Sequence, residues 1–297
     1  MSAAHIALVS ARGARKLDED LPPLRAALEA GGARVAIARW DDPKIDWSQF
    51  DLALLRSTWD YAQRLPEFLQ WIEGAATGTR LLNPPQVVRW NTDKHYLGAL
   101  ERAGVPVVPS TFVETGEDAQ RTLDVFLKTH PGAEDVVIKS SVGAGSKDAQ
   151  RHARSSREDM LAHLKRLLDA GRSALMQPYL ISVDAHGETA LLFFDGQYSH
   201  AIRKGPLLQR GAEPVRGLFA VEQITAREPS SAEREVAQRA LDAIPFARPL
   251  LYARVDLIHD ESGAPRLLEL ELTEPSVFLA HAAGSAERFA RAILHRA

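Results

Sequence analysis

Strands and helices alternate along the first 90 residues, and this order limits the possible folds more than any other feature. The apolar patterns predict, in order, a strand at 5–10, a helix at 21–32, strands at 33–40 and 50–57, a helix at 66–76 and a strand at 79–85. A β-α-β order is typical of a parallel, doubly wound sheet, whose ligands bind at the carboxyl ends of the strands. We therefore expect an N-terminal α/β domain over residues 1–90, with ligand loops at "SARG", "RSTWDY" and "NPP".

From Asn91 onwards the order of elements changes. A helix at 91–104 is expected to be capped by Asn91 or Thr92 and closed by Gly104. The elements expected after it are an extended segment at 105–113, a helix at 119–130, a strand at 135–140, a glycine-bearing loop at 141–146, a helix at 156–171, a strand at 173–180, hairpins at 188–204 and 251–272, and helices at 230–244 and 285–297. The first hairpin turns at Asp195-Gly196 and the second near 261–263.

The size and charge of the chain restrict its possible functions. Its 297 residues exceed the usual size of one core, so two or three domains are expected. A net charge of −3 gives no sign of nucleic-acid or membrane-surface binding. The absence of cysteine excludes disulfides, thiolate metal sites and cysteine nucleophiles, and it fits a reducing compartment. The first apolar run is too short for a signal peptide and no run has transmembrane length, so a cytoplasmic location is expected.

The C-terminal hairpin carries the strongest chemical signal. Glu269 and Glu271 are spaced i, i+2 in "LLELELTEPS", so a strand directs both to one face. The turn near 261–263 places Asp256 roughly opposite Glu269 or a neighbour. Three carboxylates on one face repel each other unless cations lie between them, and Mg²⁺ prefers oxygen ligands. Asp256, Glu269 and Glu271 are therefore candidate metal ligands, with a solvated polar face as the alternative; Glu274 is out of register with them.

A phosphate site is expected near the metal, because Mg²⁺ held by few carboxylates usually retains waters and a phosphate. Lys139 ends a buried strand and precedes "SVGAGS", where Gly143 and Gly145 allow backbone N–H groups to wrap an anion. The loop lacks the spacing of a P-loop, and an ordinary strand-to-helix turn is the alternative. Lys94, at a helix start, is a weaker candidate.

Three further basic residues are placed to act on phosphate. Arg203 and Lys204 end a hairpin strand, and Arg254 lies two residues before Asp256. In a strand Arg254 and Asp256 share a face, so the guanidinium would lie beside the metal and suit phosphoryl oxygens. An ordinary salt bridge is the alternative.

The order of these motifs resembles the ATP-grasp superfamily over the whole chain. Lys94 is followed by "VIK" with its glycine loop, then by "QPYL", "GE…IRK", "ARVD" and "ELEL". Within the superfamily the chain resembles the glutathione synthetase and RimK-like ligases, and most closely the group that closes O-ureido-D-serine to D-cycloserine. The closer resemblance is carried by "VVRWNTDKHYL", "SKDAQRH", "MQPYLISVDAHGETALLFFDGQYSHAIRKG" and "RVDL…LELELTEPS".

The resemblance implies an ATP-grasp fold, in which two α+β lobes clamp ATP behind the doubly wound N-terminal domain. A small lobe with the lid loop would span 91–176, and a lobe with the metal site would span 177–297. ATP would be bound by Lys94, Lys139, Ser141, Gly143, Gly145, Ser146, Gln177, Pro178, Tyr179, Leu180 and Glu188. Asp256, Glu269 and Glu271 would hold Mg²⁺, with a charge that suits two ions. Arg254, Lys204 and Arg203 would act in catalysis by steadying the phosphoryl group and the acyl phosphate.

The implied reaction is an ATP- and Mg²⁺-dependent carboxylate–amine ligation through an acyl phosphate, on a small amino-acid-like substrate. In the cyclo-ligase group both reacting groups belong to one molecule. A kinase that stops at phosphorylation and a non-catalytic nucleotide-binding protein are the alternatives. The intact set of charged residues argues against the second, and a homodimer is a family-level expectation.

Substrate choice is expected to lie outside the phosphate and metal residues. The candidate substrate residues are Ser57, Thr58, Trp59, Asp60, Tyr61, Asn83, His200 and Ser276. The loop "STWDY" has hydrogen-bonding and aromatic side chains that suit an amino acid, with a helix-capping turn as the alternative. For His200 the alternative is a packed strand histidine. This loop and the lid depart from the cyclo-ligase pattern, so the identity of the substrate stays open.

Overall fold

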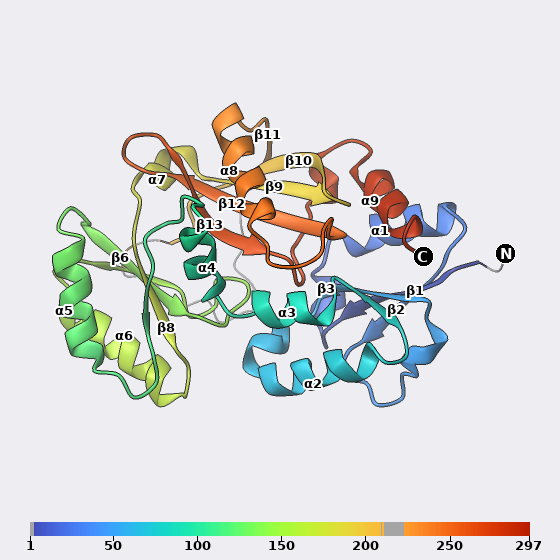
Figure 1. Cartoon of the computed structure of the whole chain (residues 1–297), viewed down its shortest axis with the longest axis horizontal. Coiled ribbons are helices and arrows are strands. Elements are labelled where there is room, and N and C mark those ends of the chain that lie inside the picture. Colours follow the sequence, from blue (N-terminus) through green and yellow to red (C-terminus); the bar gives the residue numbers. More distant parts are fainter. Residues whose placement is uncertain (1–2, 209, 211–222) are drawn as a thin grey trace.

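The computed structural model describes residues 3–208, 210 and 223–297 and contains three sheets, which confirms the expected mixed architecture (Figure 1). The N-terminal sheet is parallel and has the order β2-β1-β3-β4. Its strands are β1 (His5–Ser10), β2 (Arg34–Arg39), β3 (Leu52–Ser57) and β4 (Arg80–Leu82). The predicted strand at 79–85 is shorter than expected, because Pro85 already begins a helix.

Helices cover both faces of the N-terminal sheet, as a doubly wound fold requires. On one face, Ile6 and Leu8 of β1 pack against α1 (Leu21–Ala30) and α9 (Ser285–Leu294). On the other face, the alternate β1 residues pack against α2 (Leu65–Ala75) and α3 (Pro85–Asn91). The C-terminal helix α9 thus lies beside α1, far from it in sequence (Figure 1).

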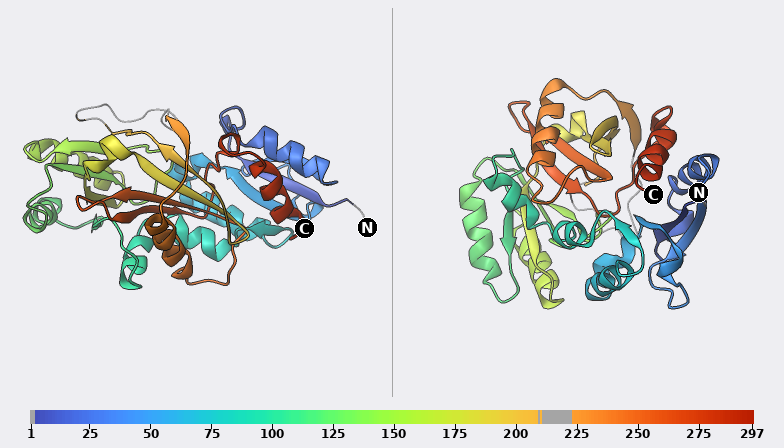
Figure 2. Two further views of the ribbon diagram at one scale, coloured as in Figure 1. Left: turned by 90° about the horizontal axis from the view of Figure 1, so that it is seen from above. Right: turned by 45° about the vertical axis from the view of Figure 1, so that its right-hand side comes forward.

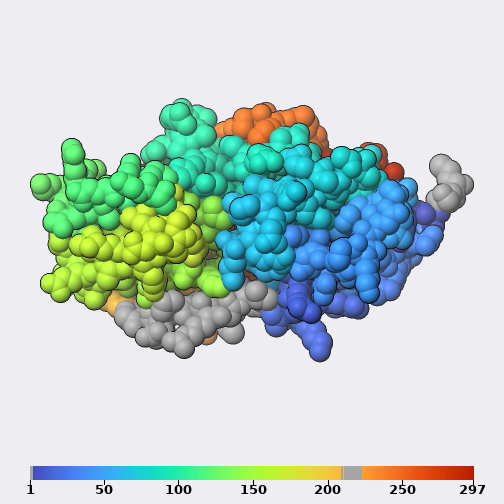
Figure 3. Space-filling view, turned by 90° about the horizontal axis from the view of Figure 1, so that it is seen from below, coloured from blue at the N-terminus to red at the C-terminus, as the bar shows by residue number. Residues whose placement is uncertain are grey.

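The central sheet has the order β5-β8-β6-β7 and is antiparallel. Its elements are β5 (Thr111–Val113), β6 (Asp135–Ser140), β7 (Gln150–Ala153) and β8 (Ala174–Pro178), with α5 (Ala119–Thr129) and α6 (Arg157–Asp169) packed on one face. The two helices leave the opposite face to the interior of the molecule (Figures 1 and 2). The space-filling view from below shows a continuous surface between the N-terminal sheet region, in blue, and the central region, in green (Figure 3).

The C-terminal sheet has the order β11-β10-β9-β12-β13. Its strands are β9 (Glu188–Phe194), β10 (Gln197–Lys204), β11 (Ile224–Arg227), β12 (Tyr252–His259) and β13 (Pro265–Glu271). The helices α8 (Ser231–Asp242) and α4 (Tyr96–Arg102) cover the face that carries Leu191, Val255 and Leu270. The other face packs in part against α9 and is otherwise open to the functional cavity described below.

Several local predictions are confirmed. Asp195 and Gly196 both have positive φ angles, 49° and 74°, as a two-residue hairpin turn requires. The helix expected at 230–244 is present as α8, and Ser230 forms a capping box with Glu233 at its start. Gly104 follows α4 with a φ angle of 86°.

The predicted helix at 91–104 is wrong at its start. Asn91 is the last residue of α3, and a separate helix, α4, begins at Tyr96. The Asn91 side chain does not cap a helix: it donates to Leu270 O at 2.7 Å and accepts from Leu272 N at 2.7 Å. The short elements β7, β11, α7 (Ser182–His186) and four 3-10 helices, η1 (Ala14–Lys16), η2 (Trp47–Gln49), η3 (Trp59–Gln63) and η4 (Leu279–His281), were not predicted.

The buried Asp20 joins the N-terminal domain to the segment after β13. Its carboxylate accepts hydrogen bonds from the backbone N–H groups of Val277, Phe278 and Leu279 at 2.7, 3.0 and 2.7 Å. Arg56 lies 3.6 Å from the same carboxylate and donates to Pro275 O at 3.0 Å. The loop that follows β13 is therefore held in place by residues that lie more than 200 positions earlier in the chain.

We expect the substitution Asp20→Ala to lower the free energy of unfolding by about 2 kcal/mol or more, because three buried N–H groups lose a charged acceptor. The exposed neighbour provides a matched control, and Glu19→Ala should change it by no more than about 0.5 kcal/mol. Urea unfolding followed by circular dichroism measures both. Equal effects of the two substitutions would contradict the role given to Asp20.

Candidate functional site

A cavity of about 490 Å³ lies where the three sheets meet. Trp59 and Tyr61 line it from the N-terminal domain, Lys139 from the central sheet, and Asp256 and Glu269 from the C-terminal sheet. It is open at the carboxyl end of β3, as expected for a doubly wound sheet.

The C-terminal hairpin has the predicted register. Asp256 on β12 pairs with Glu269 on β13, and Arg254 pairs with Glu271, so all four side chains share the cavity face. The intervening Val255 and Leu270 are fully buried on the other face. One bulge, between Asp256 and Leu257, shifts the register beyond this point without moving the four charged residues from their face.

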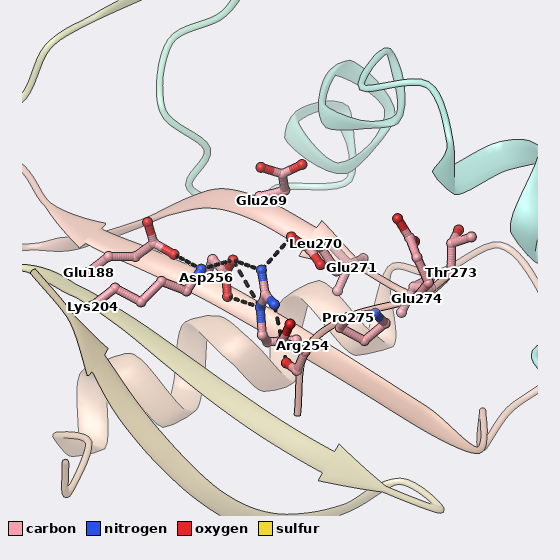
Figure 4. Close-up of polar contacts among 12 residues, drawn as sticks. Glu188, Lys204, Arg254, Asp256, Glu269, Leu270, Glu271, Thr273, Glu274 and Pro275 are labelled. Atoms are coloured by element: carbon pink, nitrogen blue, oxygen red, sulfur yellow. Dashed lines mark hydrogen bonds and ion pairs between the residues drawn. The ribbon is translucent and has the colours of Figure 1, made fainter. Parts of the chain in front are cut away.

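A chain of ion pairs runs along this face (Figure 4). Arg254 binds both oxygens of Asp256 at 2.8 Å and also contacts Glu271. Lys204 on β10 binds Asp256 Oδ2 at 2.8 Å and Glu188 at 2.5 Å. The salt bridge that was the alternative reading of Arg254 is therefore present, within the cavity.

Lys94 connects β13 to the glycine loop. It lies between α3 and α4, rather than at a helix start, and its Nζ is 2.8 Å from Glu269 Oε1 and 3.1 Å from Gly143 O. Its backbone N–H donates to Ser141 O at 2.9 Å. Lys139 lines the same cavity, and its Nζ has no hydrogen bond or ion pair with the described residues. It is thus available to an anion.

The charged groups divide into ionised and protonated carboxyls. Burial raises the pKa of Asp256, but Arg254 and Lys204 outweigh it and lower the pKa below its usual range. In the same way, Lys94 and Lys139 outweigh burial at Glu269 and lower its pKa.

Two other carboxyls behave in the opposite way. Burial, together with Asp256 and Glu269, raises the pKa of Glu271 to about 7 despite the contact with Arg254. Burial and the neighbouring Glu271 raise the pKa of Glu274 to about 8. Burial also lowers the pKa of Lys139. These three pKa shifts favour the neutral forms of Glu271, Glu274 and Lys139.

The donor atoms fit Mg²⁺ in kind, since carboxylate oxygens are its usual protein ligands. Among the described residues, however, no three His, Asp or Glu side chains are gathered as a metal cluster. Arg254, Lys204 and Lys94 hold the carboxylates in ion pairs instead. A bound cation would have to replace these basic groups around the carboxylates.

The glycine loop and the end of β8 form the remaining walls of the cavity. Gly143, Gly145 and Ser146 line the cavity, and both Gly145 and Ser146 have positive φ angles, 63° and 58°. Gln177, Pro178, Tyr179 and Leu180 also line it, beside the apolar side chains of Val137, Val183, Ile258 and Leu268. Tyr179 N donates to Asp135 O, so this one amide of the predicted adenine linker is already used.

Several predicted site residues do not line the cavity. Arg203 is adjacent to Lys204 on β10 and therefore points to the opposite face, where it donates to the carbonyls of Ala185 and His186. His200 is the packed strand histidine that was its alternative, with Nε2 2.9 Å from Val277 O. Asn83 is a structural link that binds Tyr252 O, Leu272 O and Leu251 N.

The loop after β3 contributes fewer residues than expected. Trp59 and Tyr61 line the cavity, whereas Ser57 and Thr58 are fully buried and Asp60 accepts a hydrogen bond from Trp40. Ser141 is also absent from the lining; it is buried, and its role is through its backbone. Ser276 does line the cavity.

Four acidic residues of the cavity were not selected from the sequence. Asp18, Glu19 and Asp20 follow β1, whose carboxyl end was expected to carry a ligand loop, but the prediction stopped at "SARG". Glu274 was placed outside the metal set because it is out of register, yet it lies in the cavity three residues beyond Glu271.

The chain is similar over its full length to a known protein. A family model described as the N-terminal domain of the D-cycloserine synthetase DcsG matches residues 6–83. The cycloserine biosynthesis protein DcsG of Streptomyces lavendulae is 41% identical over 295 residues, which cover 98% of both proteins. A crystal structure of D-cycloserine synthetase DcsG has a TM-score of 0.92 at 41% identity, with 99% of each chain covered.

More distant solved structures share the fold. The ATP-grasp ligase PsnB complexed with a minimal precursor has a TM-score of 0.66 at 19% identity, covering 99% of this chain and 100% of its own. The D-alanine–D-alanine ligase of Bacillus anthracis has a TM-score of 0.71 at 15% identity, with coverages of 99% and 97%. None of the helices within the described ranges has the length and apolar character needed to cross a membrane.

The pKa values of Glu271 and Glu274 predict how stability depends on pH. Because the folded protein keeps protons that the unfolded chain releases, the free energy of unfolding should fall as pH rises from about 5 to about 8. Glu274→Gln removes one of the two groups, so the decline should become shallower by about 1 kcal/mol or more over this range. Urea titrations of the nucleotide-free protein at several pH values measure the slope. An unchanged slope would contradict the assigned protonation of Glu274.

Proposed function

The chain belongs to the D-cycloserine synthetase (DcsG) family of ATP-grasp ligases, and from this we infer that it closes one small amino-acid-like substrate, O-ureido-D-serine or a close analogue, into a ring. The enzyme is an ATP-dependent carboxylate–amine ligase. The proposal adds that the carboxylate and the nitrogen belong to the same molecule. The observation that supports it most is the identity of 41% over 98% of both chains, because the matched region extends over the segments that line the cavity.

The described side chains suit the two steps of such a reaction. A substrate carboxylate oxygen attacks the γ-phosphorus of ATP, and ADP leaves. The substrate nitrogen then attacks the acyl carbon, loses a proton and expels phosphate. Lys139 is free to bind ATP phosphates, while Arg254 and Lys204 face the same cavity and can neutralise the charge that develops on phosphoryl oxygens.

Asp256, Glu269 and Glu271 are the residues that we propose would hold Mg²⁺, with a charge that suits two ions. When bound, these ions would shield the phosphate charge and orient the γ-phosphate. The side chains of Glu269 and Glu271 are 23% and 27% exposed, and both line the cavity, which gives ions access to them. The apolar surface beside Gln177–Leu180 suits an adenine ring.

The proposed reaction predicts that the enzyme releases phosphate from ATP when O-ureido-D-serine is the only other substrate. A ring-closed product should form in equal amount, because each acyl phosphate is consumed within the same molecule. A coupled phosphate assay and mass spectrometry measure both. Phosphate release that requires a separate amine would contradict ring closure, and phosphorylated substrate without a C–N bond would indicate a kinase.

The metal assignment predicts that Mg²⁺ strengthens ADP binding. At a ligand concentration of one hundred times Kd, ADP with Mg²⁺ should stabilise the protein by about 2.7 kcal/mol. In Glu271→Ala the Mg²⁺-dependent part of the rise in Tm should disappear, while Glu261→Ala, on the exposed hairpin turn, should behave like the wild type. Differential scanning fluorimetry with ADP, with and without Mg²⁺, measures this. Full retention of the Mg²⁺ effect in Glu271→Ala would contradict the assignment.

A further inference from the structure

Glu274 is a buried carboxyl group that lines the cavity. The residue is 6% exposed and lines the cavity, and its side chain makes no hydrogen bond or ion pair with any of the residues that the structure describes. Figure 4 shows it beyond the end of the chain of ion pairs, which stops at Glu271. A buried carboxyl without a partner is unfavourable, so its presence in a ligand cavity needs a reason.

The backbone around Glu274 is fixed from several sides. Tyr252 Oη donates to Thr273 O at 2.6 Å, and Trp59 Nε1 donates to Glu274 O at 3.4 Å. Arg56 donates to Pro275 O at 3.0 Å. The position of this residue is therefore set by the N-terminal domain as well as by the C-terminal sheet.

The two basic groups that act most on Glu274 already have carboxylate partners. Lys94 is 2.8 Å from Glu269, and Arg254 binds Asp256 and Glu271. Neither donates a hydrogen bond to Glu274, although both favour its ionised form. A cation that binds next to Glu274 would thus not have to displace Lys94 or Arg254 from this carboxyl group.

The other neighbours of Glu274 suit an organic cation. Tyr61 is 4% exposed, lines the cavity and lies close enough for the charge of Glu274 to raise its pKa, after the larger effect of burial. Trp59 lines the cavity on the same side, and its indole binds the backbone of Glu274. Aromatic rings beside a carboxylate favour ammonium groups, whereas Mg²⁺ requires several oxygen ligands.

We propose that Glu274, with Tyr61 and Trp59 beside it, forms the subsite for the substrate ammonium group that does not react. This proposal rests on the proposed function, since it assumes an amino-acid substrate whose carboxylate lies near Arg254. Glu274 lies three positions after Glu271, and it is close enough to Arg254 for the guanidinium to act on its pKa. The α-ammonium group and the carboxylate of an amino acid are bonded to the same carbon, so one small substrate can place its carboxylate near Arg254 and its ammonium group at Glu274.

The protonation of Glu274 fits such a role. Burial and Glu271 raise its pKa to about 8, which favours the neutral carboxyl at neutral pH. An ammonium group beside it favours the carboxylate, because an opposite charge stabilises the ionised form. The subsite would therefore be charged only when it is filled.

The test compares binding of two probes, O-ureido-D-serine and its analogue with hydrogen in place of the α-amino group. Both are titrated calorimetrically into the full-length enzyme with Mg²⁺ and ADP present, so that no turnover occurs. The wild type should prefer the amine by at least about tenfold, the range expected for a charged hydrogen bond in a buried site. In Glu274→Gln this preference should fall to about one, through weaker binding of the amine alone.

Two variants serve as controls. Glu261→Gln, on the exposed hairpin turn, should keep the tenfold preference. Asp18→Asn removes another acidic side chain that lines the cavity from the N-terminal domain, and it should keep the preference as well. The rise in Tm with ADP should be the same in Glu274→Gln as in the wild type, which shows that the fold and the nucleotide site are intact.

Three results would overturn the subsite: a preference retained in Glu274→Gln, an equal loss of affinity for both probes in that variant, or no preference for the amine in the wild type. A preference lost in Asp18→Asn alone would move the ammonium group to Asp18 and also overturn it. If the wild type binds O-ureido-D-serine but releases no phosphate from ATP, the proposed function fails while the subsite stands.

Discussion

The pairing of Asp256 with Arg254 and Lys204 is the interaction on which the rest of the site depends. Asp256 is 2% exposed, and a lone carboxylate at that depth would be strongly destabilising. The bidentate guanidinium and the lysine satisfy it from β12 and β10, so the ionised site persists without a ligand. Its two basic partners each bind a second carboxylate: Lys204 binds Glu188, and Arg254 binds Glu271.

The N-terminal domain contributes to the site mainly by holding a loop. Asp20 binds three consecutive backbone N–H groups at 277–279, and Arg56 binds a carbonyl just before them. These contacts fix the segment that carries Glu274 and Ser276 against Trp59 and Tyr61. The end of the cavity that holds Glu274 and Ser276 is thus built from the N-terminal and C-terminal sheet regions, while the end that holds Lys139 and Glu269 is built from the central and C-terminal sheets.

The sequence predicted the hairpin because two simple rules coincide there. Strand alternation places Glu269 and Glu271 on one face, and a turn near 261–263 leaves little freedom in the register, so Asp256 had to lie near Glu269. The same alternation already separates Arg203 from Lys204, which are adjacent on one strand. The alternation of side chains along a strand could therefore have excluded Arg203 from the cavity face that Lys204 occupies.

Other features depend on contacts that no local pattern contains. Asn91 has the residue type of a helix cap, but its side chain binds the backbone of β13, about 180 positions away in the chain. Asn83 and His200 likewise form links between segments distant in sequence, and their polar character gave no sign of it. Asp20 has no motif at all, and only the folded structure shows the three N–H groups that it binds.

Lys94 links β13 to the glycine loop. One ammonium group binds both Glu269 on β13 and the carbonyl of Gly143, so an anion that attracts Lys94 competes with both contacts together. Losing Lys94 leaves Glu269 as an unpaired carboxylate, since Lys139 acts on it only through charge and makes no contact. The unpaired carboxylate is then favourable only if another cation takes the place of Lys94. Anion binding at the loop and cation binding at β13 are therefore expected to reinforce each other, which is the coupling that a metal–nucleotide complex requires.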